Sequence, residues 1–414
     1  MPEVRYEWAA GATLQEHSKK KHQILRQYLS EYLDVRCRIP QQSRFRLAVI
    51  DGFCGGGAYI GGEPGSPVIF LETLRDVTQR INLERAVEGK AQISFECFFV
   101  FNDRDPDAIG ILKRNLAPLI MECRELEHLS IQIEFMNLRF EQAYPLVKKQ
   151  LASKRIYRSV FFNLDQCGNT HIPQEIIVDI LNSYQSAEVL LTFAAKTIFT
   201  FLSRNNKETL EKTLVRHGID SKDIEDLASH ANKREWRAAV ERLVFDSYRR
   251  CGPYVSPFAI NNPDGWLYWL LHFANEPKAR QVYNDLLHQN VGIQGHHGRA
   301  GLNMLRYDPR YEGDDYLFAA EDRNRAHKEL LEDIPNVVSE FGDAVTLADF
   351  YRSVSNETPA HSEDIARAMI DHPDLTVRTV NGGKRRSHKG IHPSDVLVLN
   401  PQRSFFLLPP MSSK

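Results

Sequence analysis

The chain has 414 residues, which leaves room for two or three domains of roughly 150 residues each. Hydrophobic residues make up 42% of the chain and charged residues 26%, and this composition excludes a largely disordered or fibrous protein. Lys and Arg number 52 against 54 Asp and Glu, a net charge of −2, so any surface that binds a polyanion must be local.

Residues 13–37 predict an amphipathic helix ahead of the first strand, because Ile24, Leu25, Tyr28 and Leu29 fall on one helical stripe. The N-terminal residues lack the basic-then-apolar pattern of a secretion signal. No window approaches the roughly 18 charge-free apolar residues of a membrane span. We therefore expect a cytoplasmic protein that does not enter a membrane.

Short apolar runs then alternate with helical patterns. The predicted strands are residues 45–50, 95–101, 131–135, 159–164 and 188–193, and the predicted helices between them are residues 67–77, 107–116, 142–154 and 173–184. Parallel neighbours need crossover connections, which the helices supply. The first 200 residues therefore predict an α/β domain of the Rossmann-like type, with a doubly wound and mostly parallel sheet.

After residue 200 the pattern changes to charged helical stretches, and we predict no strand up to residue 343. Helices are expected at residues 207–215, 221–230 and 235–250, and an aromatic-rich helix at residues 265–288. This part, residues 201–343, is interpreted as a helical cap or insertion.

The last part, residues 344–414, predicts two helices, a strand, a basic turn and a second strand. The helices are residues 346–355 and 362–370, and the strands are residues 375–380 and 395–399. This order of elements is the order of a winged helix.

The six cysteines are scattered, with no C-x-x-C pair and no zinc-type spacing. We expect reduced, mostly buried cysteines and no metal site. Cys167 has no recognisable base near it in the sequence, which argues against a nucleophile.

The strongest local motif is Asp51-Gly52-Phe53-Cys54-Gly55-Gly56-Gly57, at the end of the first predicted strand. Glycines there let the backbone approach a bound cofactor closely. The spacing does not fit the G-x-G-x-x-G pattern of dinucleotide sites, because the loop continues to Gly65-Ser66-Pro67, where Ser66 is the expected helix N-cap. A nicotinamide-dependent oxidoreductase is therefore disfavoured.

Polar side chains also follow the other strands. Asp103 follows the second strand, where a carboxylate suits the hydroxyls of a ribose, Asn137 follows the third, where an amide suits an adenine edge, and Asp165 follows the fourth. Because parallel strands end at one edge, we expect these residues to form one site with Asp51. The alternative for Asp103 is a helix cap, and for Asp165 a bond to a loop amide.

Taken together, these motifs resemble the three-Cys-motif partner (TcmP) family, whose members are similar to class I S-adenosylmethionine-dependent methyltransferases. The resemblance covers about residues 15–300. Besides the glycine motif and Gly65-Ser66-Pro67, it is carried by residues 21–29, by Asp103-Arg104-Asp105-Pro106, by Leu164-Asp165-Gln166-Cys167-Gly168 and by residues 268–275.

The resemblance implies an S-adenosylmethionine pocket. Its cofactor-binding residues would be Asp51, Gly52, Phe53, Cys54, Gly55, Gly57, Asp103, Asn137 and Asp165. Asp165 would face the methyl group and accept the proton of the substrate. The chain departs from the family at Cys54, where alanine is usual, and at Gln166, where the family has the proline of a D-P-x-G run.

The C-terminal turn carries cations without an acid. Lys384, Arg385, Arg386 and Lys389 suit phosphate contacts, as in the wing of a DNA-binding winged helix, and a solvated hairpin that docks a protein is the alternative. Two functions follow. One is a methyltransferase acting on or bound to nucleic acid; the other is an inactive methyltransferase-like scaffold bound to a three-cysteine iron–sulfur protein of the radical type.

Overall fold

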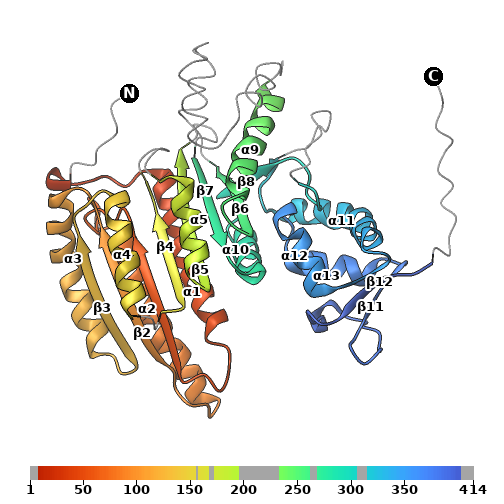
Figure 1. Ribbon diagram of the computed structural model, residues 1–414, viewed down its shortest axis with the longest axis horizontal. Coiled ribbons are helices and arrows are strands. Elements are labelled where there is room, and N and C mark those ends of the chain that lie inside the picture. The colour runs from red at the N-terminus through yellow and green to blue at the C-terminus, as the bar shows by residue number, and fades with distance from the viewer. Residues whose placement is uncertain are drawn as a thin grey trace. The chain divides into compact units, whose positions relative to one another are not determined.

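The structure is a computed structural model, and it describes residues 8–154, 157–166, 172–194, 233–261, 268–304 and 315–401 (Figure 1). The chain divides into two compact units, Met1–His297 and Gly298–Lys414. Within the described residues, none of the helices combines the length and hydrophobicity that a membrane crossing requires.

A large sheet forms the centre of the first unit. Its strands are β1 (Arg44–Asp51), β2 (Ser94–Asn102), β3 (Leu129–Met136), β4 (Ser159–Leu164), β5 (Ser186–Ala194), β6 (Tyr254–Ile260), β7 (Tyr268–Ala274) and β8 (Gln294–His297). They follow the order β3-β2-β1-β4-β5-β7-β6-β8. The first five strands are parallel, whereas β7 runs antiparallel to both β5 and β6. The five strands predicted in the first 200 residues are therefore confirmed.

Helices cover both faces of this sheet (Figure 1). On one face α1 (Glu16–Arg36) packs against α2 (Ser66–Val87) and α10 (Pro277–Gln289), and α2 packs against α3 (Pro106–Glu125). On the other face lie α4 (Phe140–Lys154), α5 (Gln174–Ser183) and α9 (Lys233–Arg249). Because both faces are covered, strands such as β4 are buried along their whole length, which explains their continuous apolar runs.

The strand order identifies the fold class. The order reverses between β1 and β4, so the crevice at their carboxyl ends is the topological switch point of a doubly wound sheet. Strand β7, antiparallel between β5 and β6, extends this sheet beyond its five parallel strands. The first unit therefore has a Rossmann-like fold with a doubly wound and mostly parallel sheet.

The prediction of one helix at residues 265–288 is wrong, and so is the predicted absence of strands from residues 201–343. Tyr268–Ala274 is strand β7, and only Pro277–Gln289 is helical. A continuous apolar run such as YWLLHFA fits a buried strand as well as a buried helix, so its periodicity does not decide between them. Strand β6 was missed because Pro257 interrupts its pattern, although it pairs with β7 along its length.

The predicted helix at residues 235–250 corresponds to α9, whereas those at residues 207–215 and 221–230 lie outside the described residues. Helix α2 begins at Ser66, so its N-cap is Gly65 rather than Ser66. The described cysteines are buried and form no disulfide.

The second unit is smaller and contains its own sheet. Its elements are β9 (Asp315–Tyr316), α11 (Ala320–Glu340), β10 (Ala344–Thr346), α12 (Leu347–Val354), η2 (Ser355–Glu357), α13 (Ser362–Asp371), β11 (Leu375–Arg378), η3 (His388–Gly390) and β12 (Val396–Leu399). Strand β12 lies between β10 and β11 and is antiparallel to both. Helix α11, which the sequence analysis did not predict, packs against α13.

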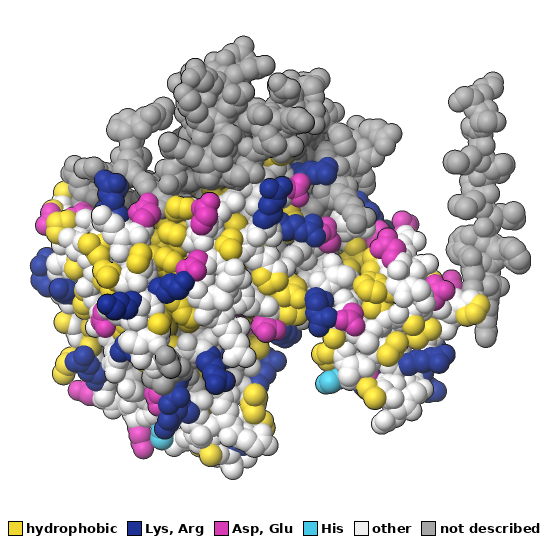
Figure 2. All heavy atoms as spheres, in the orientation of Figure 1, with side chains coloured by type: hydrophobic (Ala, Val, Ile, Leu, Met, Phe, Trp, Pro, Cys, Tyr) yellow, Lys and Arg dark blue, Asp and Glu magenta, His cyan; other side chains and the backbone are white. Residues whose placement is uncertain are grey.

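Charge is mixed over the visible surface of the protein. On the face drawn in Figure 2, Lys and Arg side chains are interspersed with Asp and Glu.

Candidate functional site at the carboxyl ends of the strands

The structure brings the three predicted acids to one edge of the sheet. Asp51 is the last residue of β1, Asp103 follows β2 directly, and Asp165 follows β4. The parallel register pairs Asp51 with Phe101 on one side and with Asn163 on the other. The acids thus lie on both sides of the switch point between β1 and β4, where open α/β sheets bind ligands.

Asp51 is fully buried, and this burial changes its protonation. Burial raises the pKa of Asp51 to about 7, and hydrogen bonds from the Ser66 hydroxyl and the Phe53 N–H only partly oppose it. The Oδ2 atom of Asp51 has no hydrogen-bond partner among the described residues. A buried acceptor without a partner is costly, so this oxygen marks a place where a ligand donor would fit.

The glycine loop is held by backbone hydrogen bonds to both neighbouring strands. The N–H of Gly52 donates to the carbonyl of Asn163 (2.9 Å), and the N–H of Cys54 donates to that of Asn102 (3.0 Å). Gly55 and Gly57 have φ angles of +58° and +81°, which glycine adopts without strain. Burial also raises the pKa of the Cys54 thiol well above its ordinary value, which argues against a thiolate in the loop.

An indole covers this loop. Trp8, in the short helix η1 (Trp8–Ala10), lies against Gly55 and Gly56, so closely that a Cβ atom on Gly55 would come 2.2 Å from the Trp8 ring. Trp8 also contacts the Tyr59 ring, with centroids 5.4 Å apart. The segment before α1 therefore forms part of the wall of the site.

The Gly55→Ala substitution is expected to lower the free energy of unfolding by about 2–3 kcal/mol, from the positive φ angle and from overpacking against Trp8. Urea denaturation measures the loss. The double variant Trp8→Ala/Gly55→Ala removes the ring that clashes, so alanine at position 55 should cost less in that background. Equal costs in both backgrounds would contradict the packing of Trp8 on the loop.

Asp103 organises the loop from the second strand. Its Oδ2 accepts the N–H of Gly55 and its Oδ1 accepts the N–H of Asp105, both at 2.9 Å. Burial raises the pKa of Asp103, while these two backbone donors oppose the rise. Asn137 is exposed beside it and donates to the carbonyl of Asp103 (2.9 Å). Phe53 is half-buried, with its ring 5.8 Å from that of Phe140.

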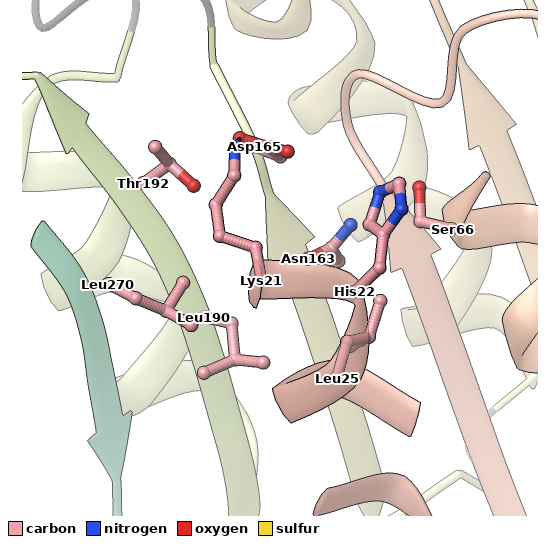
Figure 3. Close-up of a pocket in the computed structure, with 9 residues that line it drawn as sticks. All are labelled: Lys21, His22, Leu25, Ser66, Asn163, Asp165, Leu190, Thr192 and Leu270. Atoms are coloured by element: carbon pink, nitrogen blue, oxygen red, sulfur yellow. Dashed lines mark hydrogen bonds and ion pairs between the residues drawn. The ribbon is translucent and has the colours of Figure 1, made fainter. Parts of the chain in front are cut away.

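Asp165 is paired with a lysine from the first helix. The Nζ of Lys21 lies 2.5 Å from Oδ1 of Asp165, and Figure 3 shows the lysine reaching upward from α1 to the end of β4. The Lys21 side chain is 8% exposed and that of Asp165 26%. Burial alone would raise the pKa of Asp165, but the charge and the hydrogen bond of Lys21 outweigh it and leave this pKa below its ordinary value.

A small cavity adjoins this ion pair (Figure 3). It has an empty volume of about 260 Å³, part of which is open to solvent. Its lining consists of Lys21, His22, Leu25, Ser66, Asn163, Asp165, Leu190, Thr192 and Leu270. Burial lowers the pKa of His22 to about 4, so its imidazole is neutral near pH 7, and its Nδ1 has no hydrogen-bond partner among the described residues.

Sequence reasoning did not place Lys21 or His22 in the site. One signal was present, because Lys21 lies on the buried stripe of α1, three and four residues before Ile24 and Leu25. A charged residue on such a stripe indicates a buried ionic partner. The identity of that partner, 144 positions later in the chain, is visible only in the folded structure.

Gln166 takes the place of the proline that the family resemblance leads us to expect. Its side-chain amide donates to the carbonyl of Thr192 and accepts the N–H of Ile172, both at 3.2 Å. These bonds hold the end of β4 against the end of β5 without a proline ring. Cys167 and Gly168 lie outside the described residues.

The predicted nucleic-acid contacts lie in the second unit, and they differ in whether the side chain is exposed or bound to an acid. Lys384, Arg386 and Lys389 are exposed. Arg385 instead donates from Nε and Nη2 to the carboxylate of Asp395, at 2.8 and 3.1 Å. Its guanidinium is therefore bound within the unit.

Comparison with known proteins gives two results. No protein-family model matches the chain, and no curated protein matches it. Among solved structures, it is similar to the DszA carbon methyltransferase, with a TM-score of 0.31 and 10% identity over 64% of this chain and 55% of that one, about half of its length. It is also similar to a candidate rRNA-methylase from Clostridium thermocellum, with a TM-score of 0.23 and 11% identity over 63% of this chain and 97% of that one.

Proposed function

We propose that the protein binds S-adenosylmethionine at the carboxyl ends of β1, β2 and β4 and is a methyltransferase-like protein. The proposal rests on one observation. Asp51, Asp103 and Asp165 lie at neighbouring strand ends, around a glycine loop at the switch point of the sheet. The resemblance to the three-Cys-motif partner family points to the same pocket.

The residues present fit the chemistry of this cofactor. The partnerless Oδ2 of Asp51 suits the ammonium group of its methionine part. Each carboxylate oxygen of Asp103 accepts one backbone N–H and retains a further lone pair, which suits the hydroxyls of a ribose. Asn137 is exposed beside Asp103, and its amide would suit an adenine edge. When bound, the cofactor supplies an electrophilic methyl group on a sulfonium.

Binding requires a rearrangement of the site. The cavity beside the ion pair is far smaller than the roughly 300–1,000 Å³ of small-molecule sites. Trp8 covers Gly55 and Gly56, and Lys21 extends to the end of β4. We expect these two side chains to move when the cofactor enters.

The role of the protein in methyl transfer would be alignment, exclusion of water and removal of a proton. Asp165 is the proposed proton acceptor, but its ion pair with Lys21 weakens it as a base, so Lys21 must first withdraw. His22, neutral and with a free Nδ1 in the same cavity, is a second acceptor. A comparison of Asp165→Asn with His22→Gln would assign the role between them.

Asp103→Ala is expected to weaken S-adenosylmethionine binding by about 1–3 kcal/mol, the range for a lost charged hydrogen bond. Isothermal titration calorimetry with S-adenosylhomocysteine as a second ligand measures the change. Asp107→Ala, an exposed acid on α3, serves as the matched control and should leave the dissociation constant unchanged. If Asp103→Ala binds as tightly as the wild type, its assignment to the ribose is wrong.

Nucleic acid is the proposed macromolecular partner. The elements β10, α12, α13, β11 and β12 follow one another in the order of a winged helix, and the turn after β11 is basic. We propose that residues 344–414 form a winged-helix-like module, which follows the unit whose sheet extends to β8. The proposed substrate class rests on this turn.

A scaffold without transfer activity is the second candidate function. Two observations favour it, Gln166 in place of the family's proline and the ion pair of Lys21 with Asp165. Such a scaffold would bind an iron–sulfur protein with a three-cysteine motif. Incubation with tritiated-methyl S-adenosylmethionine and mixed DNA, RNA and protein separates the two functions. Cofactor binding without label transfer to any polymer favours the scaffold, and label on a polymer contradicts it.

A further inference from the structure

The hairpin after β11 presents four cations to solvent. Arg378, Lys384, Arg386 and Lys389 are exposed, and residues 375–391 contain no acid. The turn is well built, because the N–H of Thr379 donates to the carbonyl of Gly383 (2.7 Å) and a bridge pairs Arg378 with Lys384. The four charges are therefore displayed on a defined backbone.

Arg385, between two of these cations, has a different role. Its bidentate bond to Asp395, whose side chain is 1% exposed, ties the returning arm of the hairpin to the residue just before β12. Its N–H also donates to the carbonyl of Val377 (2.8 Å). Arg385 fixes the base of the hairpin, so it is a positioning residue and not a phosphate contact.

Helix α13 comes at the position of the recognition helix in the element order of a winged helix. Its surface is nevertheless too covered for it to enter a DNA groove. Only Arg367 and Asp371 of its residues are exposed. It packs against α11, β11 and η3, so the chain itself covers much of its surface. The helix carries three acids and one arginine, Glu363, Asp364, Asp371 and Arg367.

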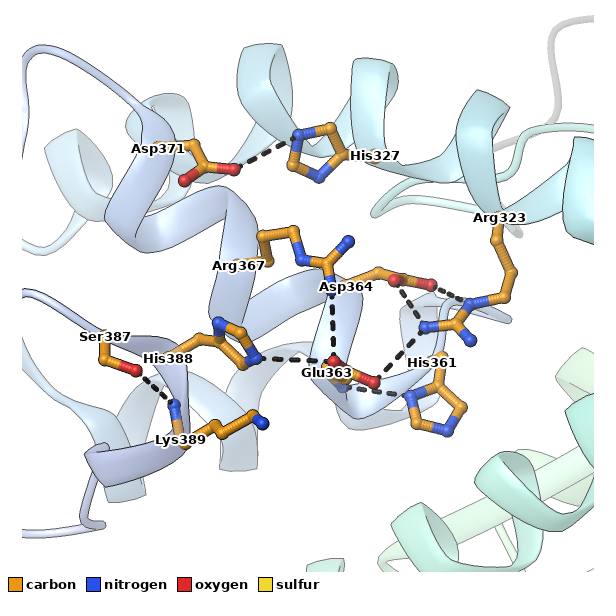
Figure 4. Close-up of polar contacts among 10 residues, drawn as sticks. All are labelled: Arg323, His327, His361, Glu363, Asp364, Arg367, Asp371, Ser387, His388 and Lys389. Carbon is orange, nitrogen blue, oxygen red and sulfur yellow. Dashed lines mark hydrogen bonds and ion pairs between the residues drawn. The ribbon is translucent and has the colours of Figure 1, made fainter.

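The polar side chains at the start of α13 are bound to one another (Figure 4). Glu363 lies between Arg367 at 3.1 Å, His388 at 3.3 Å and Arg323 at 3.6 Å. The carboxylate of Asp364 accepts hydrogen bonds from Nη2 and Nε of Arg323, at 2.6 and 2.7 Å. His388 of η3 contacts Glu363, and η3 packs against the helix, so these groups are not available to read base edges.

From these observations we infer that the second unit binds duplex nucleic acid through the phosphate backbone, using the hairpin cations alone and without reading base sequence. The inference rests on the proposed binding of nucleic acid and adds the mode of binding. Cations on a short hairpin suit phosphates, which carry no sequence information, whereas α13 is acidic and covered. Specificity for a sequence would need another part of the protein.

The test uses the full chain and two fluorescently labelled DNA duplexes of equal length and unrelated sequence, measured by anisotropy between 50 and 200 mM salt. Four phosphate contacts predict a loss of about 10²-fold in affinity over this range. Both duplexes should bind with the same dissociation constant. Lys384→Gln/Arg386→Gln should reduce the slope of log K against log salt by about 2, because two counterion-releasing contacts are removed.

Two control variants distinguish the hairpin from the rest of the unit. Lys328→Gln/Arg352→Gln removes two exposed charges from α11 and α12 and should leave the slope unchanged, as should Arg367→Gln on α13. Binding that prefers one duplex by tenfold, or that Arg367→Gln weakens, would overturn the backbone mode and leave nucleic-acid binding standing. Absence of binding to either duplex, with or without binding to phosphatidylserine vesicles, would overturn both.

Discussion

Replacing Asp51 with asparagine is expected to make the stability of the protein less dependent on pH and to stabilise it above pH 7. Burial raises the pKa of Asp51 to about 7 in the folded state, against 3.8 ordinarily. Between these values the folded state holds a proton that the unfolded state has lost, so the folded state loses about 1.4 kcal/mol of stability per pH unit from this group. The loss reaches about 4 kcal/mol above pH 7.

Asparagine keeps the shape of the side chain and never ionises. The variant and the wild type should therefore be similarly stable near pH 4, and the variant should gain over the wild type up to about pH 7, where the difference levels off. Guanidinium denaturation at several pH values measures this difference. Asp107→Asn, an exposed acid, is the control and should show no such trend. Parallel profiles for Asp51→Asn and the wild type would contradict the raised pKa of Asp51.

The same group links protonation to the proposed cofactor. If the ammonium of S-adenosylmethionine binds the free oxygen of Asp51, a positive charge nearby favours the carboxylate and lowers its pKa. Binding near pH 7 should then release a fraction of a proton. Calorimetry in two buffers of different ionisation enthalpy detects this release, which should vanish in Asp51→Asn. A release that persists in the variant would assign the proton to another group.

Replacing Lys21 with methionine is the second substitution with a large expected effect. Removing one partner of a buried ion pair leaves the other charge uncompensated, which costs about 3–5 kcal/mol. Because a quarter of the Asp165 side chain remains exposed, we expect the lower end of this range, about 3 kcal/mol. Lys19→Met, with its side chain 48% exposed on the same helix, should change stability little.

The loss of stability in Lys21→Met should depend on pH. Lys21 holds the pKa of Asp165 in the folded state below its ordinary value. The ion pair therefore stabilises the folded protein at pH values above the pKa of Asp165 in the unfolded state. This stabilisation disappears as the pH falls through the pKa of Asp165 in the folded state. The penalty of Lys21→Met should therefore shrink in acid, where Asp165 becomes neutral. Lys21→Met/Asp165→Asn should recover most of the stability at pH 7. A double variant as unstable as Lys21→Met would show that packing, and not charge, causes the loss.

The first five strands and their helices were predictable because each is a local pattern. Buried runs such as Phe95 to Phe101 end in polar or glycine residues, and helical stripes separate them. The strand β7 was not predictable in this way, since an apolar run without a period of two or 3.6 fits either element. Its state is decided by pairing with β5, 74 or more positions earlier in the chain.

By itself, the sequence determined that Asp51, Asp103 and Asp165 stand at strand ends and that the hairpin cations lack acidic neighbours, because both are properties of consecutive residues. Only the tertiary structure decided which charges remain free. Lys21 crosses from α1 to Asp165, Arg385 turns inward to Asp395, and Trp8 lies on the glycine loop. Partners of this kind are chosen by the packing of the elements, and burial then makes each contact strong enough to change a pKa or close a surface.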